Sequence, residues 1–294
     1  MFRTTPRAAL TGAALLGLGL AATGCSAQSG GATTAVTTAS SASASNAPAI
    51  SGTTAAAAST CTPQTTNVSA ESVTEIISTL AAELPKSCGF TVSGYLDGAA
   101  ELPDGLSIQD KATVDSAGNV HVAVADQGIV VDVYAVSGTE YVHLYEPGQA
   151  GTAPDSTVEG SWGSVLTSSQ AASAGVNFVK LTSTQSAAYT SGGLAGNDAL
   201  LTPGKLASDL TSGSSGWTLG GTATVDGVSC VQLTAPSAQD APATTISVNA
   251  ATGLPVQVAY TASQGSTPTT LTFTDYGTTA AVSAPSGAVD GSSL

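Results

Sequence analysis

The chain has 294 residues, of which 6 are Lys or Arg and 20 are Asp or Glu, so its formal net charge is −14 at pH 7. Nucleic-acid binding requires clustered basic residues that displace counterions from phosphates, and the Lys residues beyond Arg7 lie far apart in the sequence, which argues against a nucleic-acid partner. A hydrophobic content of 42% argues against disorder along the whole chain.

Residues 1–24 are predicted to be a lipoprotein signal peptide. Arg3 and Arg7 give a basic start, and the apolar core from Ala8 to Ala22 is too short to span a bilayer. The following Thr23-Gly24-Cys25 resembles the lipobox, where signal peptidase cuts before a Cys that carries a diacylglyceryl group, although Ala22 stands where Leu is usual. Cys25 is therefore the predicted lipidation site, on the outer face of the cell membrane. An ordinary secretory cleavage site beside a chance Cys is the alternative.

Residues 25–68 are predicted to be the lipidated Cys and a flexible linker. No charged residue occurs from Ser26 to Ser69, and Ala, Ser and Thr dominate the composition. A flexible coil of this length spans roughly 35 to 40 Å. Cleavage before Cys25 leaves 4 basic and 20 acidic residues and hence a net charge of −16. Anionic headgroups repel such a surface, so we expect the folded part to stand off the membrane.

The next segment is predicted to be an amphipathic helix. Its apolar residues recur with helical spacing, at Val73, Ile76, Ile77, Leu80, Ala81 and Leu84. Ser69 or Ser72 can cap its start, and Pro85 ends it. The apolar stripe must pack against another part of the fold.

Beyond Cys88 the spacing of apolar residues changes to every second residue, which is typical of strands with one buried face. Turn sequences such as Val225-Asp226-Gly227 separate these runs. The stretch from about 162 to 211 breaks the pattern with helical pieces around 164–174 and 203–210. So many strands with one apolar face need a second sheet or a closed curve. One domain over 69–285 and a disordered tail over 286–294 are predicted.

The order of these elements resembles the actinobacterial lipid-carrier lipoproteins of the LppX/LprA/LprF/LprG type, which share a half-closed barrel with LolA and LolB. The resemblance covers about residues 69 to 285. The evidence for it is the order of short sequence segments along the chain. These are Asp132 to Leu144, Trp162, Leu200 to Leu206, Val225 to Val228, Ala251 to Pro255 and Phe273 to Gly277. It implies an α+β fold in which a curved antiparallel β-sheet is covered by the N-terminal helix and the helical middle insertion. The middle, 165–199, looks longer than usual, and three of the cysteines have no usual counterpart in the family.

The resemblance implies that the apolar face of the sheet encloses the acyl chains of a lipid or glycolipid, which the protein carries or presents. An apolar lining suffices, because a carrier exchanges lipid with a bilayer and needs only to match hydrocarbon. The candidate cavity residues are Val92, Val122, Val124, Val131, Val133, Val142, Leu144, Val231, Leu233, Ile246, Val248, Val256, Val258, Leu271 and Phe273. The longer middle segment, 165–199, is rich in Gly and lacks a strong apolar period, and it is the candidate for a mobile entrance flap.

The alternative is that these apolar residues fill an ordinary core, which is the commoner use of such positions. The chain would then be a non-enzymatic protein-binding or sensor lipoprotein. Its contact residues would be exposed tyrosines such as Tyr95, Tyr134, Tyr141 and Tyr145. Both hypotheses allow a second protein of the cell envelope as a partner.

We expect no enzyme, no cofactor and no metal site. His121 and His143 alternate with the apolar positions, so both are expected to face outward. No G-x-S-x-G sequence occurs, and neither His has a Cys or Glu at metal-ligand spacing.

Export favours one disulfide among Cys61, Cys88 and Cys230. The pairing of Cys61 with Cys88, which brackets the first helix, is favoured. The pairing of Cys88 with Cys230 is a close competitor.

Overall fold

The computed structural model describes residues 61–95, 107–126, 128–153, 155–163, 165–191, 201–211, 216–236, 243–261 and 269–294. These residues belong to one compact unit of the chain, which contains Ala55–Leu294. The predicted signal peptide, the lipidation site Cys25, the linker up to residue 60 and residues 192–199 of the flap candidate lie outside the described residues.

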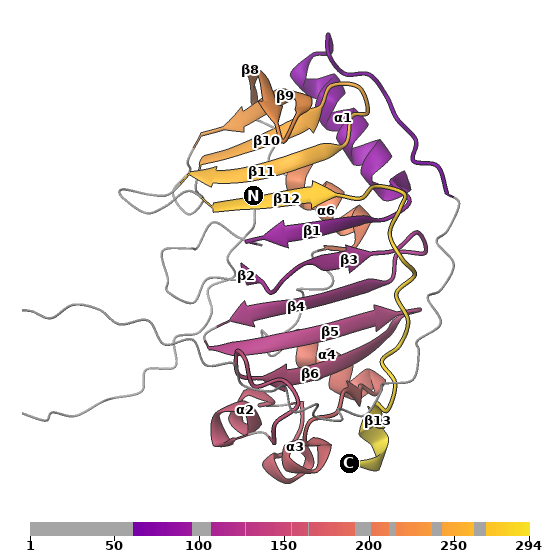
Figure 1. Ribbon diagram of the computed structural model, residues 1–294, viewed down its shortest axis with the longest axis vertical. Coiled ribbons are helices and arrows are strands. Elements are labelled where there is room, and N and C mark those ends of the chain that lie inside the picture. The colour runs from indigo at the N-terminus through magenta and orange to yellow at the C-terminus, as the bar shows by residue number, and fades with distance from the viewer. Residues whose placement is uncertain are drawn as a thin grey trace, which may run out of the picture. The chain divides into compact units, whose positions relative to one another are not determined.

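Within these described ranges, thirteen strands form one curved sheet that does not close on itself (Figure 1). The strands are β1 (Phe90–Gly94), β2 (Ser107–Ile108), β3 (Ala112–Val114), β4 (Val120–Asp126), β5 (Ile129–Val136), β6 (Thr139–Tyr145), β7 (Val179–Lys180), β8 (Thr218–Val225), β9 (Val228–Ala235), β10 (Ala243–Asn249), β11 (Pro255–Thr261), β12 (Thr269–Thr274) and β13 (Val289–Asp290). Their order across the sheet is β13, β7, β6, β5, β4, β3, β1, β12, β11, β10, β9 and β8, while β2 pairs with β4.

The first strand lies in the middle of the sheet. Strand β1 pairs with β3 on one side and with β12 on the other, both antiparallel. The strands from β2 to β7 therefore form one half of the sheet, and those from β8 to β12 form the other. Among the strands that the structure describes, only the pairing of β13 with β7 is parallel. The predicted α+β fold with a curved antiparallel sheet is confirmed.

Helix α1 (Val73–Glu83) begins where the sequence predicts. The Ser72 hydroxyl accepts a hydrogen bond from the backbone N–H of Glu75, and the Glu75 carboxylate accepts one from the backbone N–H of Ser72 at 2.8 Å. This capping box satisfies two backbone donors that a helix start leaves open. The apolar stripe is buried at Ile76 and Leu80, and the 3₁₀ turn η1 (Leu84–Lys86) follows at the proline.

The middle of the chain contains the remaining α-helices that the structure describes. They are α2 (Ser156–Ser161), α3 (Ser168–Ala174), α4 (Ser183–Ser191) and α6 (Pro203–Thr211). Helices α3 and α6 occupy the two predicted helical pieces. Helices α2 and α4 and the short strand β7 were not predicted, because their sequences lack a strong apolar period.

The folded part begins earlier than residue 69, the predicted start. The backbone N–H of Thr66 donates to Thr252 O at 3.1 Å, and that of Val68 donates to Ala250 O at 2.8 Å. The Val68 side chain is fully buried. The contacts that order this segment come from the turn after β10, so local sequence does not reveal them.

The predicted disordered tail over 286–294 is wrong for its last residues. Val289 and Asp290 form β13 against β7, and the 3₁₀ helix η2 (Gly291–Ser293) follows. The side chain of Leu294 packs against the core. This order depends on pairing with a strand about 110 residues away, which a local reading of a short polar segment misses.

Candidate functional site

The apolar positions of the sheet lie on one face. Directly paired residues of neighbouring strands share a face, because side chains alternate along each strand. Val122, Val133 and Val142 are such partners across β4, β5 and β6, and Val92 pairs with Phe273 where the two halves meet. A second row crosses the other half through Leu271, Val258, Ile246 and Leu233. The fifteen predicted cavity residues are called the apolar face below.

The apolar face is covered. All fifteen side chains are buried, and the most exposed of them, Val256, is only 8% exposed. The other fourteen belong to one hydrophobic cluster, which also contains side chains from the helices. Burial agrees with either predicted use of these residues, so their role as a lipid lining stays a prediction.

The cover over the β8 to β12 half is apolar and closely packed. Helix α1 and η1 supply Ile76, Leu80 and Leu84, all fully buried. Helix α6 packs against both elements and supplies Leu206 and Leu210. Figure 1 shows α1 beside this half and α6 behind β12 and β1.

The cover over the β4 to β6 half is different, because helix α4 consists of Ser, Thr, Gln and Ala apart from Tyr189. Tyr189 is fully buried in the hydrophobic cluster, and Ala188 packs against it. The Ser186 hydroxyl donates a hydrogen bond to the Glu140 carboxylate of β6, which ties α4 to the sheet. Local sequence gives no periodic signal for this helix, so Tyr189 was not predicted as a core residue.

A pocket of about 640 Å³ opens at the edge of the sheet, where β6, β7 and α4 meet. Glu140, Lys180 and Ser186 are among the residues that line it. None of the fifteen residues of the apolar face lines this pocket. It therefore lies beside the helix that covers the apolar face and not beneath it.

Both histidines lie on the opposite face of the sheet, as their alternation predicts. His121 Nε2 lies 3.1 Å from Asp132 Oδ1, and its ring stacks on Tyr134 with centroids 3.9 Å apart. His143, however, is only 6% exposed, so the expectation that it faces solvent is wrong. The reason is Phe178, which comes from the segment before β7 and lies 5.2 Å from the His143 ring, between centroids.

The surroundings of His143 disfavour its charged form. Burial lowers the pKa of His143 below its ordinary value of 6.5, while the nearby Asp132 carboxylate opposes that shift. Among the described residues, no group of three or more His, Cys, Asp or Glu side chains is arranged to hold a metal ion. We assign no reaction to this face.

A disulfide joins Cys61 to Cys88, with Cα atoms 5.6 Å apart. This is the pairing that the sequence favoured. It ties the start of the described chain to the segment between η1 and β1. Cys230 is a buried free thiol, and burial raises its pKa, which disfavours the reactive thiolate.

No helix within the described ranges combines the length and the apolar character needed to cross a membrane.

No family model and no curated protein sequence matches the chain. Among solved structures, LprF from Mycobacterium bovis is similar with a TM-score of 0.42 and 12% identity, over 73% of this chain and 97% of that chain. Lipoprotein LppX from Mycobacterium tuberculosis is similar with a TM-score of 0.39 and 15% identity, over 71% of this chain and 99% of that chain. A structure of MucB in complex with MucA(peri) gives a TM-score of 0.30 and 17% identity, over 68% and 53% of the two chains. LprF and LppX are lipoproteins of the type that the sequence resemblance names.

Proposed function

We propose that this chain is a cell-envelope lipoprotein, anchored through Cys25, that binds acyl chains of a lipid or glycolipid and carries or presents them without catalysis. The bound chains lie between the apolar face and helix α4. The observation that supports this most is the continuity of the apolar face across both halves of one open sheet. An acyl chain needs only such a surface, because it gains about 0.8 kcal/mol per buried CH₂ relative to water.

Of the helices that cover the apolar face, α4 can be displaced at the smallest cost in free energy. Its displacement exposes one large side chain, Tyr189, which costs about 1.5 to 3 kcal/mol. It also breaks the hydrogen bonds from Ser186 to Glu140 and from Gln185 to the Gly291 carbonyl. An acyl chain that enters beneath α4 replaces the lost apolar contact. Helices α1 and α6 stay in place, because each buries two Leu or Ile side chains and the two helices pack against each other.

Two neighbouring residues of β4 provide a matched test. Val122 lies on the apolar face, whereas Ala123 pairs with Asp132 on the opposite face. Val122→Phe fills the space that an acyl chain would occupy, whereas Ala123→Phe adds the same bulk elsewhere. We expect Val122→Phe to weaken the binding of a fluorescent fatty acid by roughly tenfold or more, and Ala123→Phe to leave it unchanged. Thermal unfolding of both variants serves as the folding control, and equal affinities would contradict the proposal.

The second candidate is a protein-binding or sensor lipoprotein with a filled core. The observation that favours it is the near-complete burial of the apolar face by side chains of this chain alone. The same titration separates the two functions. A wild-type protein that binds no fatty acid at any concentration below the onset of micelles would support the filled core.

A further inference from the structure

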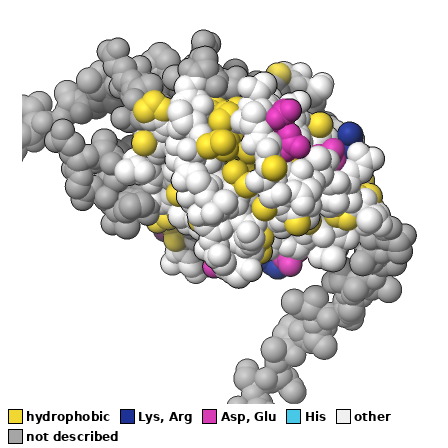
Figure 2. Space-filling model, turned by 90° about the horizontal axis from the view of Figure 1, so that it is seen from above, with side chains coloured by type: hydrophobic (Ala, Val, Ile, Leu, Met, Phe, Trp, Pro, Cys, Tyr) yellow, Lys and Arg dark blue, Asp and Glu magenta, His cyan; other side chains and the backbone are white. Residues whose placement is uncertain are grey.

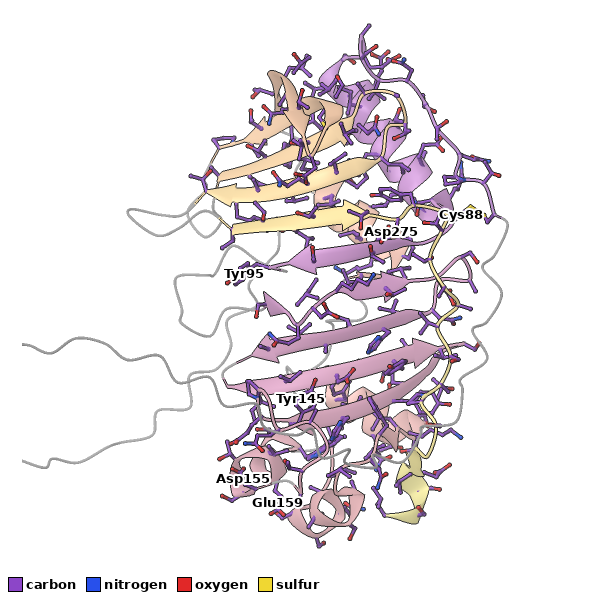
Figure 3. All side chains as sticks on the ribbon, in the orientation of Figure 1. Cys88, Tyr95, Tyr145, Asp155, Glu159 and Asp275 are labelled. Carbon is purple, nitrogen blue, oxygen red and sulfur yellow. A yellow bond between two sulfur atoms is a disulfide. The ribbon has the colours of Figure 1, made fainter. Side chains whose placement is uncertain are left out.

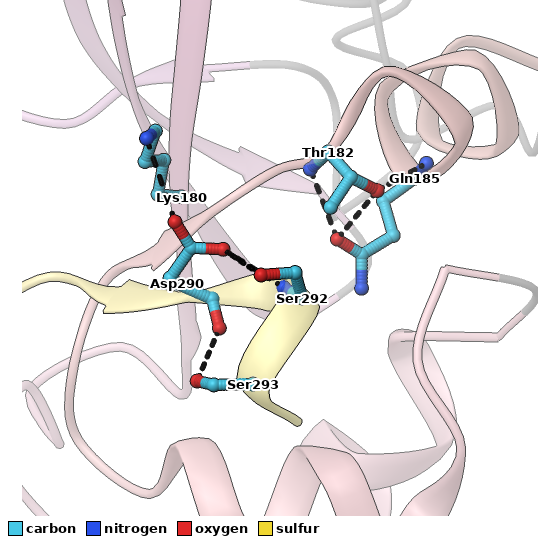
Figure 4. Close-up of polar contacts among 6 residues, drawn as sticks. All are labelled: Lys180, Thr182, Gln185, Asp290, Ser292 and Ser293. Atoms are coloured by element: carbon cyan, nitrogen blue, oxygen red, sulfur yellow. Dashed lines mark hydrogen bonds and ion pairs between the residues drawn. The ribbon is translucent and has the colours of Figure 1, made fainter.

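The two ends of the sheet are built differently. At one end, β7 and β13 are only two residues long, and the Lys180 ammonium lies 3.5 Å from the Asp290 carboxylate (Figure 4). The same carboxylate accepts a hydrogen bond from the backbone N–H of Ser292 at 2.9 Å, which starts η2. Short strands and charged side chains are devices that prevent another strand from adding to a sheet edge.

At the opposite end of the sheet, most of the edge strand lacks these protective features. Strand β8 has eight residues, without charge or proline, and within the described residues it pairs only with β9. A register shift between Leu219 and Gly221 disturbs its start, but Gly221 to Val225 pair regularly. In an antiparallel strand, alternate residues direct their N–H and C=O groups to opposite sides. Half of these groups in β8 therefore point away from β9.

The half of the sheet that ends in β8 is nearly free of charge. Among the described residues of 216–236, 243–261 and 269–274, only Asp226 is charged, although the chain carries a net charge of −14. Two acidic molecules therefore meet little repulsion along the strand edge itself, although helix α1 at the same end carries Glu75 and Glu83. Figure 2 views the end that carries β8 and α1, where hydrophobic side chains gather and acidic ones lie to one side.

Leu219 adds an apolar contact at this edge. It is 51% exposed, and it pairs with Leu233, so it continues a row of the apolar face to the last strand. An exposed Leu at the end of a buried row remains uncovered in a single molecule. A strand added beside β8 would cover it.

We infer that β8 pairs with β8 of a second copy of this chain, antiparallel and about a two-fold axis. Each copy offers the same uncharged strand, so one self-complementary contact forms and closes the assembly at two. The axis lies perpendicular to the sheet, so the apolar faces of both copies lie on the same side. One strand pair buries much less than the roughly 1,200 to 2,000 Å² of a typical stable interface, so the dimer is weak. The inference does not rest on lipid binding.

Sedimentation equilibrium of the full chain in density-matched detergent tests the inference, over concentrations from about micromolar to about millimolar. We expect a reversible monomer–dimer equilibrium, with amide hydrogen exchange of residues 218–225 slowing as the concentration rises. Leu219→Lys and Thr222→Lys each bring one positive charge from either copy into the paired edge and should weaken association by roughly tenfold or more. Val176→Lys is the matched control, because Val176 is a 40% exposed apolar residue elsewhere, and it should leave association unchanged.

Three results would overturn the inference. The first is a monomer at every concentration, which would leave this edge to an extended segment of another protein. The second is a dimer that Val176→Lys weakens as strongly as Leu219→Lys does. The third is a dimer whose β8 amides exchange as fast as those of the monomer.

Discussion

The backbone N–H of Val282 donates a hydrogen bond to Asp115 Oδ2 at 2.9 Å, across 167 residues of sequence. This bond ties the segment after β12 to the turn between β3 and β4. Figure 3 shows that this segment leaves the sheet at Asp275, on the same side as Cys88. Tyr95 lies on the other side (Figure 3), where the opposite ends of the strands are found. Asp115 is 4% exposed, and its carboxylate also accepts hydrogen bonds from Ala117 and Asn119.

Asp115→Ala should be one of the most destabilising single changes in the chain. It removes the acceptor of four hydrogen bonds, three of which come from backbone N–H groups. We expect the free energy of unfolding to fall by about 2 to 4 kcal/mol. Urea denaturation measures the change. Ser116→Ala, at an exposed position of the same turn, should shift it by less than about 0.5 kcal/mol, and a similar loss in both variants would contradict the assignment.

The disulfide should stabilise the fold by restricting the unfolded chain. Cys61 and Cys88 are 27 residues apart, so the loop-entropy relation gives a stabilisation of about 3 to 4 kcal/mol. Cys61→Ser should lower the urea midpoint accordingly and make it insensitive to reductant, whereas the wild-type midpoint should fall when reductant is added. Non-reducing peptide mapping that links Cys88 to Cys230 would show that the pairing is wrong.

His143 should make the protein less stable as the pH falls. Its pKa is lowered by burial in the folded state, so the unfolded state takes up a proton first as the pH falls through about 6.5. Stability is thus lost between that pH and the lower folded-state pKa. His143→Gln, which stays neutral, should lose less stability than wild type between about pH 7.5 and pH 5.5.

Unfolding midpoints at several pH values measure this difference. The Asp275 carboxylate does not contribute to the pH dependence in this range. The hydrogen bond that it accepts from Thr91 lowers its pKa below the ordinary value of 3.8. Parallel stability curves for wild type and His143→Gln over this range would contradict the assignment.

Loosening helix α4 should speed lipid exchange, if the proposed function holds. Ser186→Ala removes the hydrogen bond from α4 to Glu140, a bond to a charged group worth about 1.5 to 3 kcal/mol. We expect stopped-flow uptake of a fluorescent fatty acid to become several-fold faster or more. Thr184→Ala changes an exposed residue of the same helix and should leave the rate unchanged. Equal rates in all three proteins would place the entrance elsewhere.

The features that local sequence encodes were predicted correctly. The start of α1 follows from Ser72 and Glu75, whose side chains and backbone satisfy each other within four residues. The one-faced strands follow from alternation, as at Val131 and Val133 of β5. Cross-strand pairing then places the predicted residues on one face without further information.

The features that depend on distant partners were missed. Helix α4 is tied to β6, about 46 residues earlier in the chain, by the hydrogen bond from Ser186 to Glu140, and its own sequence has no apolar period. Strand β13 exists because β7 offers it an edge. The burial of His143 depends on Phe178, which lies 35 positions along the chain. Local pattern contains no signal for any of these contacts.

The central claim is that this chain holds a lipid by non-covalent contacts. The most direct test compares two masses of the wild-type protein extracted from membranes. The denaturing mass includes only covalent lipid, such as that predicted on Cys25, whereas the native mass also includes any lipid held non-covalently. We predict that the native mass exceeds the denaturing mass by one acyl lipid, and that Val122→Phe abolishes this excess while Ala123→Phe retains it. Identical native and denaturing masses, unchanged after incubation with envelope lipids, would contradict the claim.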